Sequence, residues 1–103
     1  SILGNAVYND YLVVFQNVTI NTSTDLEGNP APVLGKGLFL GAGAKIIGNK
    51  PIGDRVSVSV DTTVYNCTIP DDKVVMTDSS GKQIIMDRKK EHCMAQNYFR
   101  IPI

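Results

Sequence analysis

The stretch LGKGLFLGAGAKIIGNKPIGDRVSVSVDTTV, residues 34–64, carries an aliphatic residue at every sixth position. The series comprises Leu34, Leu40, Ile46, Ile52, Val58 and Val64, and the same spacing runs upstream through Ile2, Tyr8, Val14 and Ile20. This spacing fits neither the apolar stripe of an amphipathic helix nor the strict alternation of a half-buried strand. A six-residue period predicts a β-solenoid, in which short strands meet at corners and successive coils stack.

A second inward position accompanies the first. The fourth residue after each aliphatic is mostly small or apolar: Ala6, Leu12, Val18, Leu38, Ala44, Val56, Thr62 and Thr68. Each hexapeptide is therefore expected to point one large and one small side chain inward. Gly35, Gly41 and Gly53 directly follow the large residue, where a tight corner favours a residue without a Cβ. The alternative, a β-sandwich, predicts period-two alternation and turn signals every 8–12 residues.

The repeat is interrupted once and then ends. Residues 21–33, NTSTDLEGNPAPV, are rich in Asn, Thr, Gly and Pro and predict a loop that protrudes from the solenoid. Loops of this length without structure of their own are usually functional. After Pro70 the pattern changes to two short apolar runs around the sequence DSSG, which predicts a β-hairpin over residues 74–87.

The rest of the C-terminal region is expected to form a short helix over residues 88–97 and a strand-like apolar tail over residues 98–103. We expect a single all-β domain. Residues 1–76 form its β-helix, with the loop at 21–33, and residues 77–103 form a C-terminal hairpin and tail.

Charge and cysteine content exclude several classes of function. The 103 residues hold ten basic and ten acidic side chains, so no long-range field recruits nucleic acid or a membrane surface. Two cysteines, Cys67 and Cys93, cannot form a disulfide framework, and no His/Cys pattern has metal-ligand spacing. No apolar run approaches transmembrane length. We expect a cytoplasmic protein that binds neither nucleic acid, membrane nor metal.

The ends of the solenoid bear on assembly. A solenoid this short buries a thin core per coil and leaves flat faces that need cover, which favours oligomerisation. The sequence also enters the repeat at Ile2 without an atypical capping segment, which solenoid ends normally have. We therefore expect that further N-terminal sequence, or another chain, covers this end.

The segment GAGAKIIGN, residues 41–49, follows the Pro-bearing loop. Together with FQNVTI at 15–20 and EGNPAPVLGKG at 27–37, it resembles the C-terminal left-handed β-helix of serine acetyltransferases and related hexapeptide acyltransferases. The resemblance covers about residues 2–70 and continues across the loop without a gap. It implies a left-handed parallel β-helix, a homotrimer with active sites between adjacent subunits, acetyl-CoA as donor, and a serine or sugar hydroxyl as acceptor.

The resemblance also implies where the catalytic groups belong. In the family a histidine acts as general base on the acceptor hydroxyl, a role suited to a group that titrates near neutral pH. The family's second, loop histidine falls on Ala31, and its acidic partner falls on Asn29. The principal base is expected upstream of Ser1. The single histidine, His92, adjoins Cys93, but neighbours on a helix point in different directions, so a surface or interface role is the stronger interpretation.

The coenzyme side is mixed. By resemblance, Ala42 and Ala44 leave room for the pantetheine arm along the coil, and Lys45 supplies a point charge for a phosphate. One coil later, Val60 and Asp61 stand where the family has small residues. The family's closing Gly-x-Pro-Ala turn is replaced by KVVM at residues 73–76.

Two hypotheses therefore remain open. The first is an acetyl-CoA-dependent O-acetyltransferase whose principal base lies outside these residues. The second is a non-catalytic solenoid relative that serves as a binding or assembly module.

Overall fold

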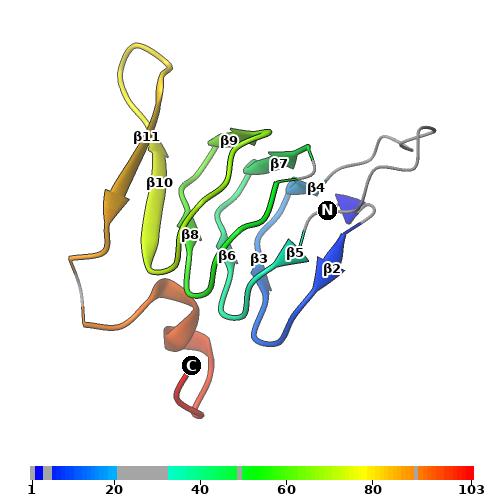
Figure 1. Ribbon diagram of the computed structural model, residues 1–103, viewed down its shortest axis with the longest axis vertical. Coiled ribbons are helices and arrows are strands. Elements are labelled where there is room, and N and C mark those ends of the chain that lie inside the picture. The colour runs from blue at the N-terminus through cyan, green and yellow to red at the C-terminus, as the bar shows by residue number, and fades with distance from the viewer. Residues whose placement is uncertain (1, 4–5, 21–32, 49, 90) are drawn as a thin grey trace.

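The computed structural model describes residues 2–3, 6–20, 33–48, 50–89 and 91–103. Short strands step along the molecule one behind the other, and the C-terminal segment folds back at one end (Figure 1). The strands are β1 (Ile2–Leu3), β2 (Val7–Tyr8), β3 (Val13–Val14), β4 (Thr19–Ile20), β5 (Val33–Leu34), β6 (Phe39–Leu40), β7 (Lys45–Ile47), β8 (Ser57–Val58), β9 (Thr63–Tyr65), β10 (Lys73–Thr77) and β11 (Gln83–Asp87).

The strands form three sheets, and all but one of their pairings are parallel. Sheet A has the order β1-β4-β7-β9, sheet B pairs β2 with β5, and sheet C has the order β11-β10-β8-β6-β3. Leu34, Ile52 and Ile69 extend sheet B through isolated parallel bridges. The chain visits sheets B, C and A in turn and then starts again. The expected all-β, parallel fold is confirmed, while the left-handed solenoid and its trimer remain predictions.

The strand register tests the six-residue spacing directly. Leu40 pairs with Val58 and Ile46 with Val64, which is three hexapeptides further along the chain. The last turn is one residue shorter, because Ile52 pairs with Ile69. The pattern therefore continues beyond Pro70 in a shifted phase, and its expected end there is wrong.

The shift also changes which residues face inward. Thr68, expected to point inward, is exposed, while Ile69 is buried and Cys67 packs partly against the core. At the other end Leu3, and not Ile2, pairs with Ile20, again one residue short of the expected spacing. A single omitted residue at a corner changes the phase without disturbing the stacking of the strands.

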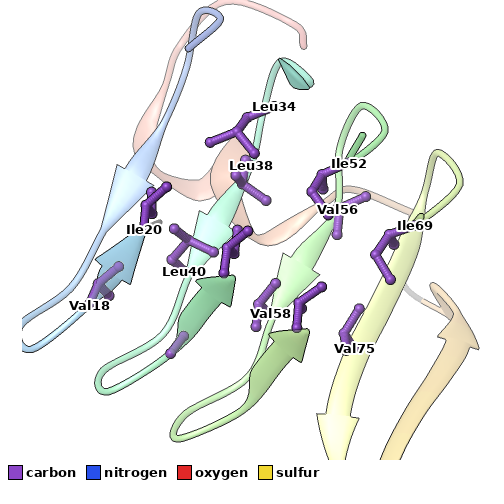
Figure 2. Close-up of a cluster of buried hydrophobic side chains, with 13 residues drawn as sticks. Val18, Ile20, Leu34, Leu38, Leu40, Ile52, Val56, Val58, Ile69 and Val75 are labelled. Atoms are coloured by element: carbon purple, nitrogen blue, oxygen red, sulfur yellow. The ribbon is translucent and has the colours of Figure 1, made fainter. Parts of the chain in front are cut away.

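The core follows the two inward rows that the sequence predicted as far as Val64 and continues in the shifted phase at Ile69 and Val75 (Figure 2). Its buried members are Val18, Ile20, Leu34, Leu38, Leu40, Ala44, Ile46, Ile52, Val56, Val58, Val64, Ile69 and Val75. Thr62, in a small-residue position, is also fully buried. At the N-terminal end the same rows are more open, since Tyr8 is 37% exposed. The large-and-small inward pattern is thus confirmed for the coils between residues 34 and 64.

The corner residues with a left-handed backbone conformation are not the glycines that follow each large inward residue. Gly35, Gly41 and Gly53 have no positive φ; a Cβ on Gly41 would instead lie 2.9 Å from the backbone nitrogen of Val60 in the next coil. These glycines therefore allow close stacking of coils. Positive φ occurs two residues later, at 71° in Gly37 and 56° in Arg55.

These positive-φ residues stack from coil to coil. The backbone N–H of Arg55 donates to the carbonyl oxygen of Lys36 at 2.7 Å. Lys36 directly precedes Gly37, the residue that corresponds to Arg55 in the coil below. Asp72 donates to Asp54 in the same way (2.9 Å). The stacked hydrogen bonds hold a left-handed conformation that is uncommon for side chains other than Gly, Asn and Asp.

The C-terminal region covers one sheet. Strands β10 and β11 form the predicted antiparallel hairpin, and β10 also pairs in parallel with β8, so the expected division at residues 76 and 77 falls inside a strand of sheet C. The predicted helix over 88–97 is instead a short 3₁₀ helix, η1 (Met94–Tyr98), and residues 99–103 form no strand. None of the described helices is long and apolar enough to cross a membrane.

The segment after the hairpin packs on the outer face of sheet C. Phe39, Cys93 and Ala95 are buried together, and Val13, Met94 and Ile103 pack against them. The Phe39 ring lies 5.2 Å from that of Phe15 and 6.0 Å from that of Tyr98, measured between centroids. Residues 91–103, called here the C-terminal cover, thus bury apolar side chains that point away from the core.

Candidate functional site

Two stacked corners join sheet C to sheet A at residues 41–44 and 59–62. The N–H of Gly43 donates to Gln16 of the coil below at 3.0 Å, and that of Asp61 donates to Ala42 at 2.9 Å. Ala42 and Val60 therefore occupy equivalent places in successive coils. Val60 is 60% exposed, and Ala42 is half-buried.

The structure separates the three predicted coenzyme residues. Ala42 lies on the outside of the corner, and Lys45 is exposed at the start of β7, where Thr19 and Thr63 flank it in register. Ala44 is fully buried in the core. Its side chain therefore belongs to the small inward row, and only Ala42 and Lys45 face solvent.

The loop residues of the predicted site cannot be placed. Asn29 and Ala31 lie outside the described residues. Their assignment to the positions of the family's acidic residue and loop histidine stays a prediction.

Val60 and Asp61 place an apolar and an acidic side chain at this corner. A Cβ on Gly43 would collide with the Asp61 carboxylate, so this carboxylate lies over the glycine. Asp61 itself has a φ of 54° and is exposed. An incoming phosphate would meet the Lys45 cation and the Asp61 anion on neighbouring coils.

A second concave region lies on the outer face of sheet C and was missed from sequence. Phe39, Ser57 and Val74 are register partners one residue before the inward row, so they point outward. With Met94 of the C-terminal cover they line a cavity of about 370 Å³. The sequence signal for this concave region was the apolar character of Val13 and Phe39. They occupy the outward position at which strands β4, β7 and β9 of sheet A carry Thr or Lys.

His92 and Cys93 are neighbours in the sequence, but their different burial argues against a reactive dyad. Cys93 is buried beside Phe39 and Ala95, whereas His92 is exposed and lines a smaller cavity at the hairpin. Within the described part of the chain, no group of three or more His, Cys, Asp or Glu side chains is arranged to hold a metal ion.

A group of charged side chains joins the last coil to the start of the segment after the hairpin. Arg55 donates from Nε and Nη2 to the two carboxylate oxygens of Asp72 at 2.7 and 3.1 Å, and Arg88 Nη1 donates to Oδ1 at 2.8 Å. The hydrogen bond from Arg55 is the largest cause that lowers the pKa of Asp72, and the same bond raises the pKa of Arg55. This bidentate pair is structural, since it links consecutive corners.

Three curated proteins similar to the chain are serine acetyltransferases. The chain is 32% identical over 71 residues, 69% of its length, to the serine acetyltransferase of Synechococcus elongatus. It is 39% identical over 44 residues, 43% of its length, to that of Synechocystis sp.. It is 26% identical over 104 residues, 94% of its length, to that of Buchnera aphidicola.

These relatives are distant and longer than the chain, which spans 29%, 18% and 38% of their respective lengths. No protein-family model matches the chain. No solved structure gives a significant match. The resemblance found at residues 41–49 and around the loop is thus supported by similarity to serine acetyltransferases over much of the sequence.

Proposed function

We propose that the chain is the left-handed β-helical part of an acetyl-CoA-dependent O-acetyltransferase of the serine acetyltransferase-like group. The observation that carries this proposal is the similarity to three serine acetyltransferases. The outward placement of Ala42 and Lys45 on one corner supports it. The acceptor is a serine or sugar hydroxyl, the assembly is a homotrimer, and the location is the cytoplasm.

Acetyl transfer assigns distinct tasks to these residues. The coenzyme arm lies along the corner at Ala42, where the absence of a larger side chain leaves room, and Lys45 neutralises a phosphate. The acceptor oxygen bonds to the thioester carbonyl carbon, the carbon–sulfur bond breaks, and the acceptor proton ends on the released thiolate. A general base accelerates this step by roughly a hundred- to ten-thousand-fold.

Neither Asn29 nor Ala31 can serve as that base, because an amide and a methyl group take up no proton near neutral pH. In this proposal the base comes from sequence outside these 103 residues. His92 of a neighbouring copy is the second candidate, since it is the chain's single histidine and is exposed.

Calorimetry with CoA tests the coenzyme site. Lys45→Ala should weaken binding about fivefold, the effect of roughly 1 kcal/mol from one exposed charge, and Asp61→Ser should strengthen it by a similar factor. Lys82→Ala, an exposed lysine in the hairpin turn, is the matched control. Equal effects of the two lysine variants would remove Lys45 from the site. A thiol-release assay with serine and several sugars then identifies the acceptor.

The second candidate function is a non-catalytic relative that binds or assembles. The Asp61 carboxylate over Gly43 favours it, because this anion lies on the same corner as the proposed coenzyme path. Here calorimetry with CoA should give no heat up to millimolar concentration. Saturable binding by the unmodified chain would exclude this candidate.

A further inference from the structure

Two adjoining cavities form a continuous groove on the outer face of sheet C. The larger, of about 370 Å³, has walls from Phe39 of β6, Val58 of β8, Phe15, Val60 and the corner residues Gly41 and Ser59. The smaller, of about 190 Å³, is lined by Met76, Met86, Asp87, Arg88, Lys89 and His92. Both are also lined by Ser57, Val74 and Met94. We call the two together the sheet C groove. Its volume lies in the range of small-molecule sites.

The groove contains a polar atom that the protein leaves unsatisfied. Ser57 is only 4% exposed, and its Oγ has no hydrogen-bond partner among the described residues. A buried hydroxyl without a hydrogen-bond partner destabilises the protein, because nothing replaces the hydrogen bonds that it makes to water. Because Ser57 lies where the two cavities meet, a ligand spanning them can supply the missing partner.

Methionine makes this junction adaptable. All three methionines of the chain line the groove, and Met94 borders both cavities. Methionine side chains are unbranched, fill irregular gaps and are common at adaptable apolar binding surfaces. Met94 lies beside Ser57 in the lining of both cavities, so we expect a change of the Met94 rotamer to give access to the Ser57 hydroxyl.

Charge differs between the two ends of the groove. The larger cavity has mostly apolar walls, whereas the smaller cavity carries Lys89 and the His92 imidazole at its rim. Asp87 also lines this end, but it is paired with Lys73, and Arg88 is bonded to Asp72. Among the described residues Lys89 has no ion-pair partner, so this end favours an anion.

We propose that the sheet C groove binds a single-chain fatty carboxylate. The hydrocarbon chain lies in the larger cavity against Phe39 and Val60, and the carboxylate lies in the smaller cavity, where it accepts a hydrogen bond from Ser57 and faces Lys89. The larger cavity shares Gly41 and Val60 with the corners of the proposed coenzyme path. The site requires no acyl-CoA and no catalysis, so laurate binding tests it separately from the acetyltransferase proposal.

The test uses laurate below its micelle concentration and the full chain labelled with ¹³C at the methionine methyl groups. Laurate should shift the Met94 methyl signal in a saturable, one-to-one titration. Dodecanol, which has the same chain without the charge, should bind about tenfold more weakly, the effect of losing one charge-assisted hydrogen bond. Butyrate should not bind. No shift with laurate, or equal affinity for dodecanol, would overturn the proposal.

Surface variants separate the two ends of the groove without disturbing the core. Lys89→Gln should weaken laurate binding about fivefold and leave dodecanol unchanged, while Lys82→Gln, outside the groove, should change neither. Val60→Glu should weaken both ligands, and Tyr65→Glu, at a residue that is 71% exposed and lines neither cavity, should weaken neither. Equal effects within either pair would reject the site.

A lipid bilayer is the other source of an anionic group joined to a hydrocarbon chain. The chain should not sediment with phosphatidylglycerol vesicles under the same conditions. Sedimentation with vesicles, combined with no response to free laurate, would show that the basic rim and the apolar walls recognise a membrane surface instead, and would overturn the proposal of a fatty carboxylate site.

Discussion

Sheets A and C share the same core but differ on their outer faces. In sheet A the outward residues in register are Thr19, Lys45 and Thr63, which are at least partly exposed. In sheet C the equivalent residues are Val13, Phe39, Ser57 and Val74, and the C-terminal cover packs against Val13 and Phe39. The inward rows hold the coils together, while the outward rows decide what each face contacts.

The largest expected effect tests whether the two inward rows are equivalent. Leu40→Ala in sheet C and Ile46→Ala in sheet A should each lower the free energy of unfolding by about 2–5 kcal/mol, because both side chains are at most 2% exposed. Urea unfolding measures this. A loss in only one variant would show that the sheets do not share a single cooperative core.

The outward rows should differ where the inward rows agree. Phe39→Ala should cost about 3 kcal/mol, since Phe39 is 8% exposed and packs against Cys93, Ala95 and Tyr98. Lys45→Ala, at the equivalent place in sheet A, should change stability by less than about 0.5 kcal/mol. If both variants cost the same in urea unfolding, the C-terminal cover contributes no packing energy to sheet C.

A smaller effect is expected at the corner between these sheets. Gly43→Ala should cost about 1–2 kcal/mol, from its φ of 75° together with the collision with Asp61. Gly81→Ala, with a φ of 86° and no atom within 4 Å of an added Cβ, should show the backbone cost alone. Removing the carboxylate by Asp61→Ala should reduce the cost at Gly43 to that at Gly81. Thermal unfolding of the four variants tests this.

Much of the inward pattern could be predicted because it depends on local spacing. Ala44 is a clear example: the repeat marks it as a small inward residue, which already separates it from Ala42 at the corner. The one-residue shift at Ile69 could not be predicted from the spacing. It is seen only in the parallel pairing of Ile69 with Ile52, which places the inward residue one position earlier than the repeat does. The left-handed conformation of Arg55 likewise depends on a hydrogen bond to the neighbouring coil.

The two candidate sites also differ in whether the sequence could predict them. The corner with Ala42 and Lys45 followed from a contiguous motif, so sequence reasoning reached it. The sheet C groove brings together β6, β8, the hairpin and Met94, which is 55 residues after Phe39 in the chain numbering, and no local pattern joins these segments. No sequence pattern marked Ser57 of β8, whose buried Oγ has no hydrogen-bond partner among the described residues.

The smallest expected effect asks whether charge as well as packing holds the C-terminal cover. The pKa of Asp72 is lowered from 3.8, chiefly by the hydrogen bond from Arg55. A lowered folded pKa stabilises the protein above pH 3.8, and this contribution is lost as the pH falls through the folded pKa. Because the carboxylate is 40% exposed, solvent limits the contribution to less than about 1 kcal/mol.

Asp72→Asn should therefore remove part of the decline in stability below pH 4 and lower stability slightly at pH 7, as measured by urea unfolding across that range. Asp78→Asn is the control for the contact with the cover, since its carboxylate bonds within the hairpin turn, to Ser80 and Lys82. Because the hydrogen bond from Ser80 lowers the pKa of Asp78 as well, this variant should also reduce the acid decline, but it should leave the cover in place. Arg88 joins Asp72 to the segment that leads into the cover. The chemical shifts of Phe39 and Tyr98 at pH 7 should stay unchanged in Asp72→Asn if apolar packing alone keeps the cover on sheet C. A Tyr98 shift that moves toward its value in Phe39→Ala would show that the ion pair holds the cover there.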